Sequence, residues 1–187
     1  MNNDKLLYGV IGLVLGVLLV MGARSTFNTA GNMDRHFIEQ MIPHHEDAIT
    51  MANVALQKAG HQEIKDLARN IKKTQSEEIE WMEKWYQDWF GKEAGLLPKA
   101  FAHSQRMTMQ MGMMGNDSDL ERLENAQPFD KAFIEEMIPH HQMAVMMAQM
   151  LKNSMVRPEM KQLADDIVRA QTEEIEQMRS WYGAWYK

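Results

Sequence analysis

The stretch MIPHHEDAITMA at residues 41–52 recurs at residues 137–148 as MIPHHQMAVMMA, with its first five letters unchanged. Both stretches belong to a longer internal repeat, in which residues 34–90 align with residues 130–186 without a gap, at a constant offset of 96 (130 − 34). Of the 57 aligned pairs, 26 are identical. Because a repeated unit of this kind buries its apolar face against its own copy, we expect two similar halves that pack together.

Each half has the periodicity of a helical hairpin. Steps of four and three residues define one helix face, which carries Phe37, Met41, His44, Ala48, Met51 and Ala55 in the first half and Phe133, Met137, His140, Ala144, Met147 and Leu151 in the second. Gly60 is expected to end the first helix of hairpin one, and Pro158 to begin the return helix of hairpin two. The sequence therefore predicts an all-α four-helix bundle of two tandem hairpins, preceded by an N-terminal hydrophobic segment.

The first helix of each half has two features near its start. Asp34 and Asp130 precede the apolar pattern and are predicted to be N-caps, each with a hydrophobic staple around it. Pro43 and Pro139 fall inside the pattern, where a proline removes a helix hydrogen bond. Either the helix continues through the proline with a kink, or it starts there; in both cases a His-His pair follows the irregularity directly.

Methionine is the unusual residue in the composition, with 19 among 187 residues, and cysteine is absent. The lack of cysteine excludes disulfides, thiolate catalysis, Cys-based zinc sites and iron–sulfur clusters, and it leaves the thioether as the soft sulfur donor. The net charge is −6 and the basic residues are scattered, which argues against binding to nucleic acid. Soft donors without cysteine suit an oxidising compartment.

The first 25 residues are predicted to be a signal peptide or a membrane anchor. Residues 6–22 form an uninterrupted apolar run, which as a helix would span about 26 Å. Ala23 and Ser25 are small residues at the positions that signal cleavage requires. We expect a periplasmic or secreted protein, with cleavage and retention as an anchor both open; the alternative is a buried core helix.

Methionine and histidine gather on the predicted inner face of each hairpin. His44 lies three residues after Met41 and seven before Met51, and folding at Gly60 brings Glu78 opposite His45. Imidazole and thioether together suit Cu(I), whereas a seam histidine that is merely a core residue would hydrogen-bond to a carboxylate such as Glu78. The candidate metal ligands are Met41, His44, His45, Met51 and Met82 in the first half and Met137, His140, His141, Met143, Met147 and Met178 in the second.

A methionine-rich linker, residues 91–129, joins the two halves. Its segment MTMQMGMM at residues 107–114 contains five thioethers that fit no single apolar face, and we predict them as ligands: Met107, Met109, Met111, Met113 and Met114. Such a run offers the two or three soft donors that a low-coordinate Cu(I) or Ag(I) site needs. The alternative is a hydrophobic patch that packs over the bundle. Further along, Ser118 and Glu121 have the spacing of a capping box for a short helix.

The repeated motif resembles that of a known family. Met-Ile-Pro-His-His followed by Ala and Met-Ala, together with Gln-x-x-Glu-Ile-x-x-Met-x-x-Trp at residues 75–85 and 171–181, is similar to the signature of the CopM-type copper-binding family, catalogued in bacteria as a domain of unknown function. The resemblance covers both halves. It implies a ferritin-like four-helix bundle, an exported location and copper binding that supports copper tolerance, and it marks Met41, His44, His45, Met51 and Met82 with their repeat partners.

We therefore expect an exported Cu(I)-binding protein, with Ag(I) as a surrogate ion, that acts as a copper buffer or chaperone and catalyses no reaction. Its partners would be metal ions and copper-transfer proteins, with the membrane contacted only through the N-terminal segment. One alternative is a helical-bundle metal oxidase, against which the absence of a Glu-x-x-His spacing counts. A second is a structural module whose methionine surface docks a partner helix, which metal titration would distinguish.

Overall fold

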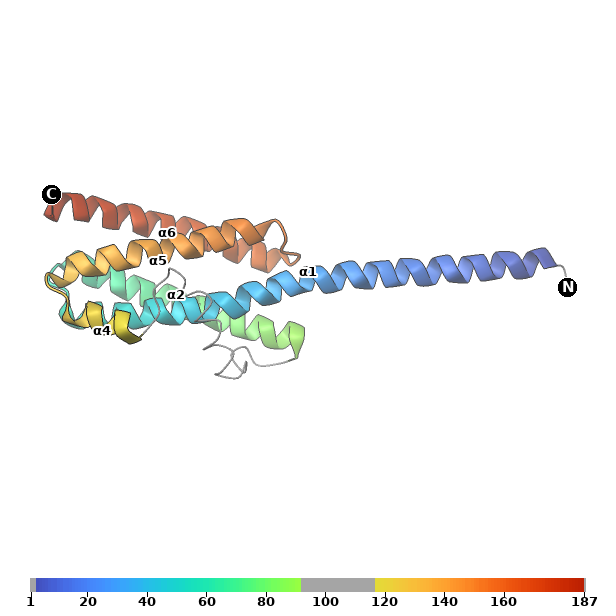
Figure 1. Cartoon of the computed structure of the whole chain (residues 1–187), viewed down its shortest axis with the longest axis horizontal. Coiled ribbons are helices and arrows are strands. Elements are labelled where there is room, and N and C mark those ends of the chain that lie inside the picture. Colours follow the sequence, from blue (N-terminus) through green and yellow to red (C-terminus); the bar gives the residue numbers. More distant parts are fainter. Residues whose placement is uncertain (1–2, 92–116, 187) are drawn as a thin grey trace.

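The computed structural model describes residues 3–91 and 117–186, with side chains from residue 31 in the first range and residue 120 in the second. These residues form α1 (Asn3–Lys58), α2 (Gln62–Phe90), α4 (Asp117–Asn125), α5 (Phe129–Lys152) and α6 (Pro158–Trp185). The described ranges contain helices and no strand, so the all-α prediction is confirmed (Figure 1). Helices α1 and α2 form the hairpin of the first half, and α5 and α6 that of the second.

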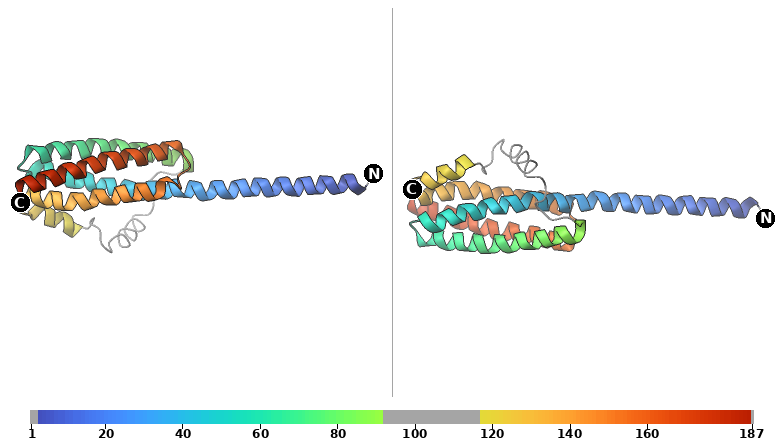
Figure 2. Two further views of the ribbon diagram at one scale, coloured as in Figure 1. Left: turned by 90° about the horizontal axis from the view of Figure 1, so that it is seen from above. Right: turned by 90° about the horizontal axis from the view of Figure 1, so that it is seen from below.

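The four long helices lie side by side, and the N-terminal half of α1 extends away from the other three (Figures 1 and 2). The predicted signal peptide or anchor falls on this part of α1, where side chains are outside the described residues. Among the helices whose side chains are described, none is long and apolar enough to cross a membrane. The short helix predicted within the linker is present as α4, which packs against α5, but Ser118 lies inside this helix and so is not its N-cap as predicted.

The N-cap prediction for Asp34 and Asp130 is wrong. Helix α1 runs through Asp34 without interruption, and α5 begins at Phe129 after the N-cap residue Pro128. Both aspartates are buried all the same, with exposed fractions of 0% and 4%. A buried carboxylate needs hydrogen-bond donors, and these two find their donors on the opposite hairpin rather than on their own helix.

Asp130 caps the turn between α1 and α2. Its carboxylate accepts hydrogen bonds from the backbone N–H of Gly60 at 2.9 Å and of His61 at 2.7 Å, at the start of α2. The ring of His61 in turn stacks on Trp185 of the second half, with 3.8 Å between centroids. The beginning of hairpin two thus holds the turn of hairpin one.

Asp34 makes the equivalent contacts with the turn between α5 and α6. It accepts hydrogen bonds from the Val156 backbone N–H at 3.1 Å and from Arg157 Nη1 at 2.7 Å. The Arg157 guanidinium lies 4.3 Å from the centroid of the Trp89 ring. Because the two turns are separated by the repeat offset of 96, the same arrangement occurs twice, and an aspartate of each half holds the helix-to-helix turn of the other.

Both helices continue through their prolines. Pro43 lies within α1 and Pro139 within α5, so the alternative in which each helix starts at its proline is excluded. A proline has no N–H to donate to the carbonyl four residues earlier. The two His-His pairs therefore follow a helical turn that lacks one backbone hydrogen bond in each half.

The interior consists of two hydrophobic clusters, each built from both halves. The proximal core, near the point where α1 leaves the bundle, joins Phe37, Ile38 and Tyr86 to residues of α5 and α6 such as Leu163 and Ile167. The distal core, near the α1–α2 turn, joins Ile64, Leu67 and Ile71 to Phe129, Phe133 and Ile175. Neither hairpin therefore has a core of its own, which agrees with the expectation that each buries its face against its copy.

Candidate metal centre

Four histidines lie between the two cores, and the equivalent residues of the two halves meet there. The rings of His44 and His140 are 3.8 Å apart between centroids and inclined at 39°. Nε2 of His44 lies 3.1 Å from the backbone carbonyl oxygen of His140, and donates to it. The sequence pattern suggested one site in each half, but this contact joins the two candidate sites across the interface between α1 and α5.

The other two histidines pair with carboxylates of the return helices. His45 Nε2 lies 2.8 Å from Glu78 Oε2, and His141 Nε2 lies 2.7 Å from Glu174 Oε2. The register expected from folding at Gly60, which put Glu78 opposite His45, is therefore correct. The sequence placed His45 on the flank of the face, yet its ring is fully buried, whereas His44 keeps a small exposed surface although its Nδ1 atom is buried.

One nitrogen of each of the four rings has no hydrogen-bond partner. Among the described residues, Nδ1 of His44, His45, His140 and His141 is buried and has no hydrogen-bond partner. Nε2 of His44, His45 and His141 faces a carbonyl or carboxylate oxygen, so a neutral ring at any of these positions has its hydrogen on Nε2 and its lone pair on Nδ1. Buried polar atoms are normally satisfied, so each of these four unpaired nitrogens is a candidate donor to a metal ion.

Burial keeps two of the rings neutral. Desolvation lowers the pKa of His44 to about 3, and the positive charge that His45 and His141 can carry lowers it further, against the opposing effect of the His140 carbonyl. The pKa of His140 is also well below the usual value, mainly through burial and next through His44. At neutral pH both imidazoles are therefore uncharged, which is the form that binds metal.

The predicted thioether ligands lie in the two cores on either side of the histidines. The proximal core contains Met41 and Met82 of the first half together with Met147 of the second. The distal core contains Met137 and Met178 of the second half together with Met51 of the first. Folding at Gly60 does bring Met41 and Met82 into one cluster, as expected, but Met51 lies in the other. Met143 is partly buried against the proximal core.

Within the described part of the chain, no group of three or more histidine, aspartate or glutamate side chains is arranged to hold a metal ion. The candidate donors of this region are imidazole nitrogens together with methionine sulfurs. The five predicted ligands of the linker, Met107, Met109, Met111, Met113 and Met114, lie outside the described residues.

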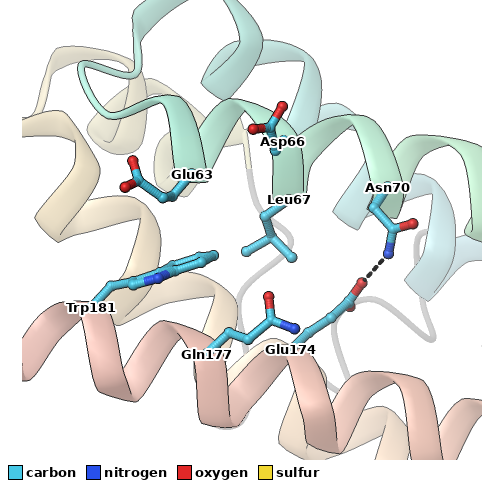
Figure 3. Close-up of a pocket in the computed structure, with 7 residues that line it drawn as sticks. All are labelled: Glu63, Asp66, Leu67, Asn70, Glu174, Gln177 and Trp181. Carbon is cyan, nitrogen blue, oxygen red and sulfur yellow. Dashed lines mark hydrogen bonds between the residues drawn. The ribbon is translucent and has the colours of Figure 1, made fainter.

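A groove of about 390 Å³ between α2 and α6 leads to one of the His–carboxylate pairs. Its lining includes Asn70 and Leu67 of α2 and Glu174 and Trp181 of α6 (Figure 3). Asn70 Nδ2 donates to Glu174 Oε1 at 2.9 Å, so the carboxylate that contacts His141 is held from two sides. The sequence analysis did not identify Asn70. The signal that could have found it is a difference between the two halves, because the residue aligned with Asn70 is Asp166.

Comparison with known proteins gives a family and a set of related structures. The model of a family described as a domain of unknown function, DUF305, matches residues 34–182. The structure of CopM in its Cu(I)-bound form is 50% identical, with a TM-score of 0.70, and the match covers 82% of this chain and 98% of that one. CopM has also been solved in Ag-bound and Cu(II)-bound forms.

Two further relatives were found, one with a lower sequence identity and one that matches only a short part of the chain. A DUF305 fragment from Deinococcus radiodurans is 28% identical, with a TM-score of 0.66, over 81% of this chain and 96% of that one. An uncharacterised protein of Acanthamoeba polyphaga mimivirus is 45% identical over 51 residues, which is 27% of this chain. That match spans about a third (34%) of the length of the viral protein.

Proposed function

The chain belongs to the DUF305 family, and from that premise we propose that it is an exported, non-enzymatic protein that binds Cu(I), and Ag(I) in its place, through histidine and methionine. The observation that carries the proposal is the contact between His44 and His140, with buried Nδ1 atoms on both rings and thioethers on either side. CopM, of which Cu(I)-bound and Ag-bound structures are known, supports the choice of ions.

The donor set favours a soft monovalent ion. Thioether sulfur binds Cu(I) well and disfavours Mg²⁺ and Ca²⁺, which prefer oxygen ligands. Zinc would use the imidazoles but would require further nitrogen, carboxylate or thiolate ligands to complete its tetrahedron. Neutral imidazole and thioether ligands carry no charge. The charge added to the buried centre on binding is therefore the charge of the ion alone, which is smallest for a monovalent ion.

We propose that the ligand sets are composite between the two halves. The proximal set would combine Met41 and Met82 with Met147, and the distal set Met137 and Met178 with Met51. The histidines at the centre, His44, His45, His140 and His141, would be available to both sets. Each hairpin then supplies part of a site, and neither binds the ion alone.

The role that follows is that of a copper buffer or chaperone. We assign the four long helices to a ferritin-like four-helix bundle that stores the ion, and the linker methionines at residues 107–114 to an exchange segment that loads it. Residues 1–25 would direct the protein to the periplasm or outside the cell. There it would lower free copper, support copper tolerance and pass copper to transfer proteins.

Titration of residues 31–187 with Cu(I) against a competing chelator tests the proposal. We expect tight binding of Cu(I) and Ag(I), weak binding of Zn(II), and a loss of most of the affinity when His44, His45, His140 and His141 are all replaced by alanine. The matched control is His36→Ala, because this histidine is exposed on the same helix. Zn(II) affinity equal to that for Cu(I), or a quadruple variant with unchanged affinity, would contradict the proposal; oxygen-dependent turnover of Cu(I) would favour the oxidase.

A further inference from the structure

Two buried carboxylates lie behind two of the histidine rings. Glu78 and Glu174 each contact the Nε2 atom of the histidine 33 residues earlier, at 2.8 Å and 2.7 Å. The contact is the same in both halves, and the rings of His45 and His141 are fully buried. Since an ionised carboxylate can only accept, the hydrogen of each neutral imidazole is on Nε2 and its lone pair is on Nδ1.

The opposite side of each ring is the side without a partner. Nδ1 of both His45 and His141 is buried, and no described residue donates a hydrogen bond to it. Leaving a buried acceptor unpaired costs about 1–3 kcal/mol. A carboxylate on one ring nitrogen and an unshared lone pair on the other is the arrangement in which a histidine is oriented to bind a metal ion.

We propose that His45 and His141 bind the soft ion through Nδ1, and that Glu78 and Glu174 are positioning residues that fix the tautomer and orientation of the two rings. The inference rests on the proposed function and specifies which atom of each ring does the binding. A hydrogen bond from Nε2–H to the carboxylate also raises the electron density at Nδ1, which strengthens its bond to the ion. Neither glutamate needs to touch the metal.

The two positioning residues are held differently. Glu174 also accepts a hydrogen bond from Asn70 Nδ2 at 2.9 Å, and its side chain lines the groove between α2 and α6 (Figure 3). The residue equivalent to Asn70 is Asp166, whose carboxylate receives hydrogen bonds from Arg169 and Gln162 instead. Replacing Asn70 with alanine should therefore leave the Glu174 side chain less well held and weaken the binding of the ion by His141. The binding of the ion by His45 should not change.

Nitrogen NMR of the chain labelled at histidine gives a readout that a merely structural role would not affect. The probe is Ag(I), which is diamagnetic. Long-range proton–nitrogen spectra identify the tautomer of each ring, with assignments from His45→Gln and His141→Gln. In the metal-free chain we expect both rings in the Nε2–H form, and on addition of Ag(I) we expect the Nδ1 resonances of both rings to move.

Four glutamate variants complete the test. Glu78→Gln and Glu174→Gln should each lower the affinity for Ag(I) by about 10–100-fold and leave the affected ring as a mixture of tautomers. Glu77→Gln and Glu173→Gln remove the same charge from exposed neighbouring positions and should change neither quantity. Thermal unfolding followed by circular dichroism would identify any variant whose loss of affinity is caused by a loss of fold.

Three outcomes would overturn the inference. If Ag(I) moves the Nε2 resonances, the glutamates are displaced and do not position the rings. If Ag(I) binds and moves the resonances of His44 or His140 but not those of His45 and His141, this inference is wrong and the proposed function stands. If the unaltered chain binds neither Ag(I) nor Cu(I), both the inference and the proposed function are wrong.

Discussion

At the scale of single residues, the charge of the central histidines follows from where the fold puts them. His44 and His140 face each other in the interior, beside two more imidazoles, and both have a lowered pKa. In the unfolded chain each ring would titrate near its ordinary value of about 6.5. Acidification thus adds protons to the unfolded chain first, and the metal-free protein should lose stability as the pH falls below that value.

We predict that the free energy of unfolding of the metal-free chain decreases between pH 6.5 and pH 5, by at most about 1.4 kcal/mol per pH unit for each of the two rings. Urea denaturation in the presence of a chelator would measure it. The variant with both His44→Gln and His140→Gln should show a flatter profile over this range. Equal slopes for the two proteins would mean that these rings take up protons in the folded state as readily as in the unfolded one.

Sequence reasoning could find some of these residue contacts and not others. The pair His45–Glu78 follows from the register of one hairpin, since a tight turn near Gly60 fixes which residues face each other. The contact between His44 and His140 depends on how two hairpins pack, which the periodicity of either one leaves open. The hydrogen bond from Asn70 to Glu174 crosses between α2 and α6 and has no counterpart in the other half.

At the scale of helices, Asp34 and Asp130 show that an aspartate before an apolar run is compatible with more than one structure. An aspartate before an apolar run is typical of an N-cap. Here α1 continues past Asp34 and α5 starts at Phe129, and the two carboxylates accept hydrogen bonds from the turns of the opposite hairpins. The N-cap prediction was therefore wrong, because these carboxylates bind the turns of the opposite hairpins and not the first turn of a helix.

Replacing Asp34 or Asp130 with alanine should lower the free energy of unfolding by about 1–3 kcal/mol each, because backbone donors in the turn before α6 or α2 lose a buried, charged acceptor. Chemical denaturation measures the change. Asp88→Ala is the control, since Asp88 forms only an exposed pair with Lys84 and should cost less than about 1 kcal/mol. Equal effects at all three positions would remove the case for capping between halves.

The linker carries a prediction of its own. Changing Met107, Met109, Met111, Met113 and Met114 to leucine keeps most of the apolar volume and removes the sulfur, at a cost usually below about 1.5 kcal/mol per packed site. We expect unchanged helix content by circular dichroism, fewer Cu(I) equivalents bound, and slower transfer of copper to a chelator. Full stoichiometry combined with a large drop in stability would show instead that the segment packs on the bundle.

At the scale of the whole molecule, the two halves cannot be separated into two independent proteins. Both cores combine side chains of the two hairpins, an aspartate of each half binds the turn of the other, and the rings of His44 and His140 meet across the interface. The repeat itself predicted two packed hairpins correctly. It could not predict that the candidate ligand sets cross between halves, because an offset of 96 relates equivalent residues without saying which of them touch.

A double-mutant cycle tests whether the metal centre is shared. If His44 and His140 serve one centre, the losses in Cu(I) binding free energy from His44→Ala and His140→Ala should not add in the double variant. Competition titration of the four proteins gives the coupling energy. Additive losses, with each single variant retaining half of the bound copper, would favour two independent sites and contradict the composite arrangement.

The composite metal centre is tested most directly by anomalous diffraction from crystals of the Cu(I)-loaded chain, with data collected at the copper absorption edge. We expect copper between the proximal and distal cores, within bonding distance of an imidazole nitrogen of at least one of the four central histidines and of thioethers from both halves. Copper found only at surface carboxylates or only at residues 107–114, with none at the histidines, would contradict it.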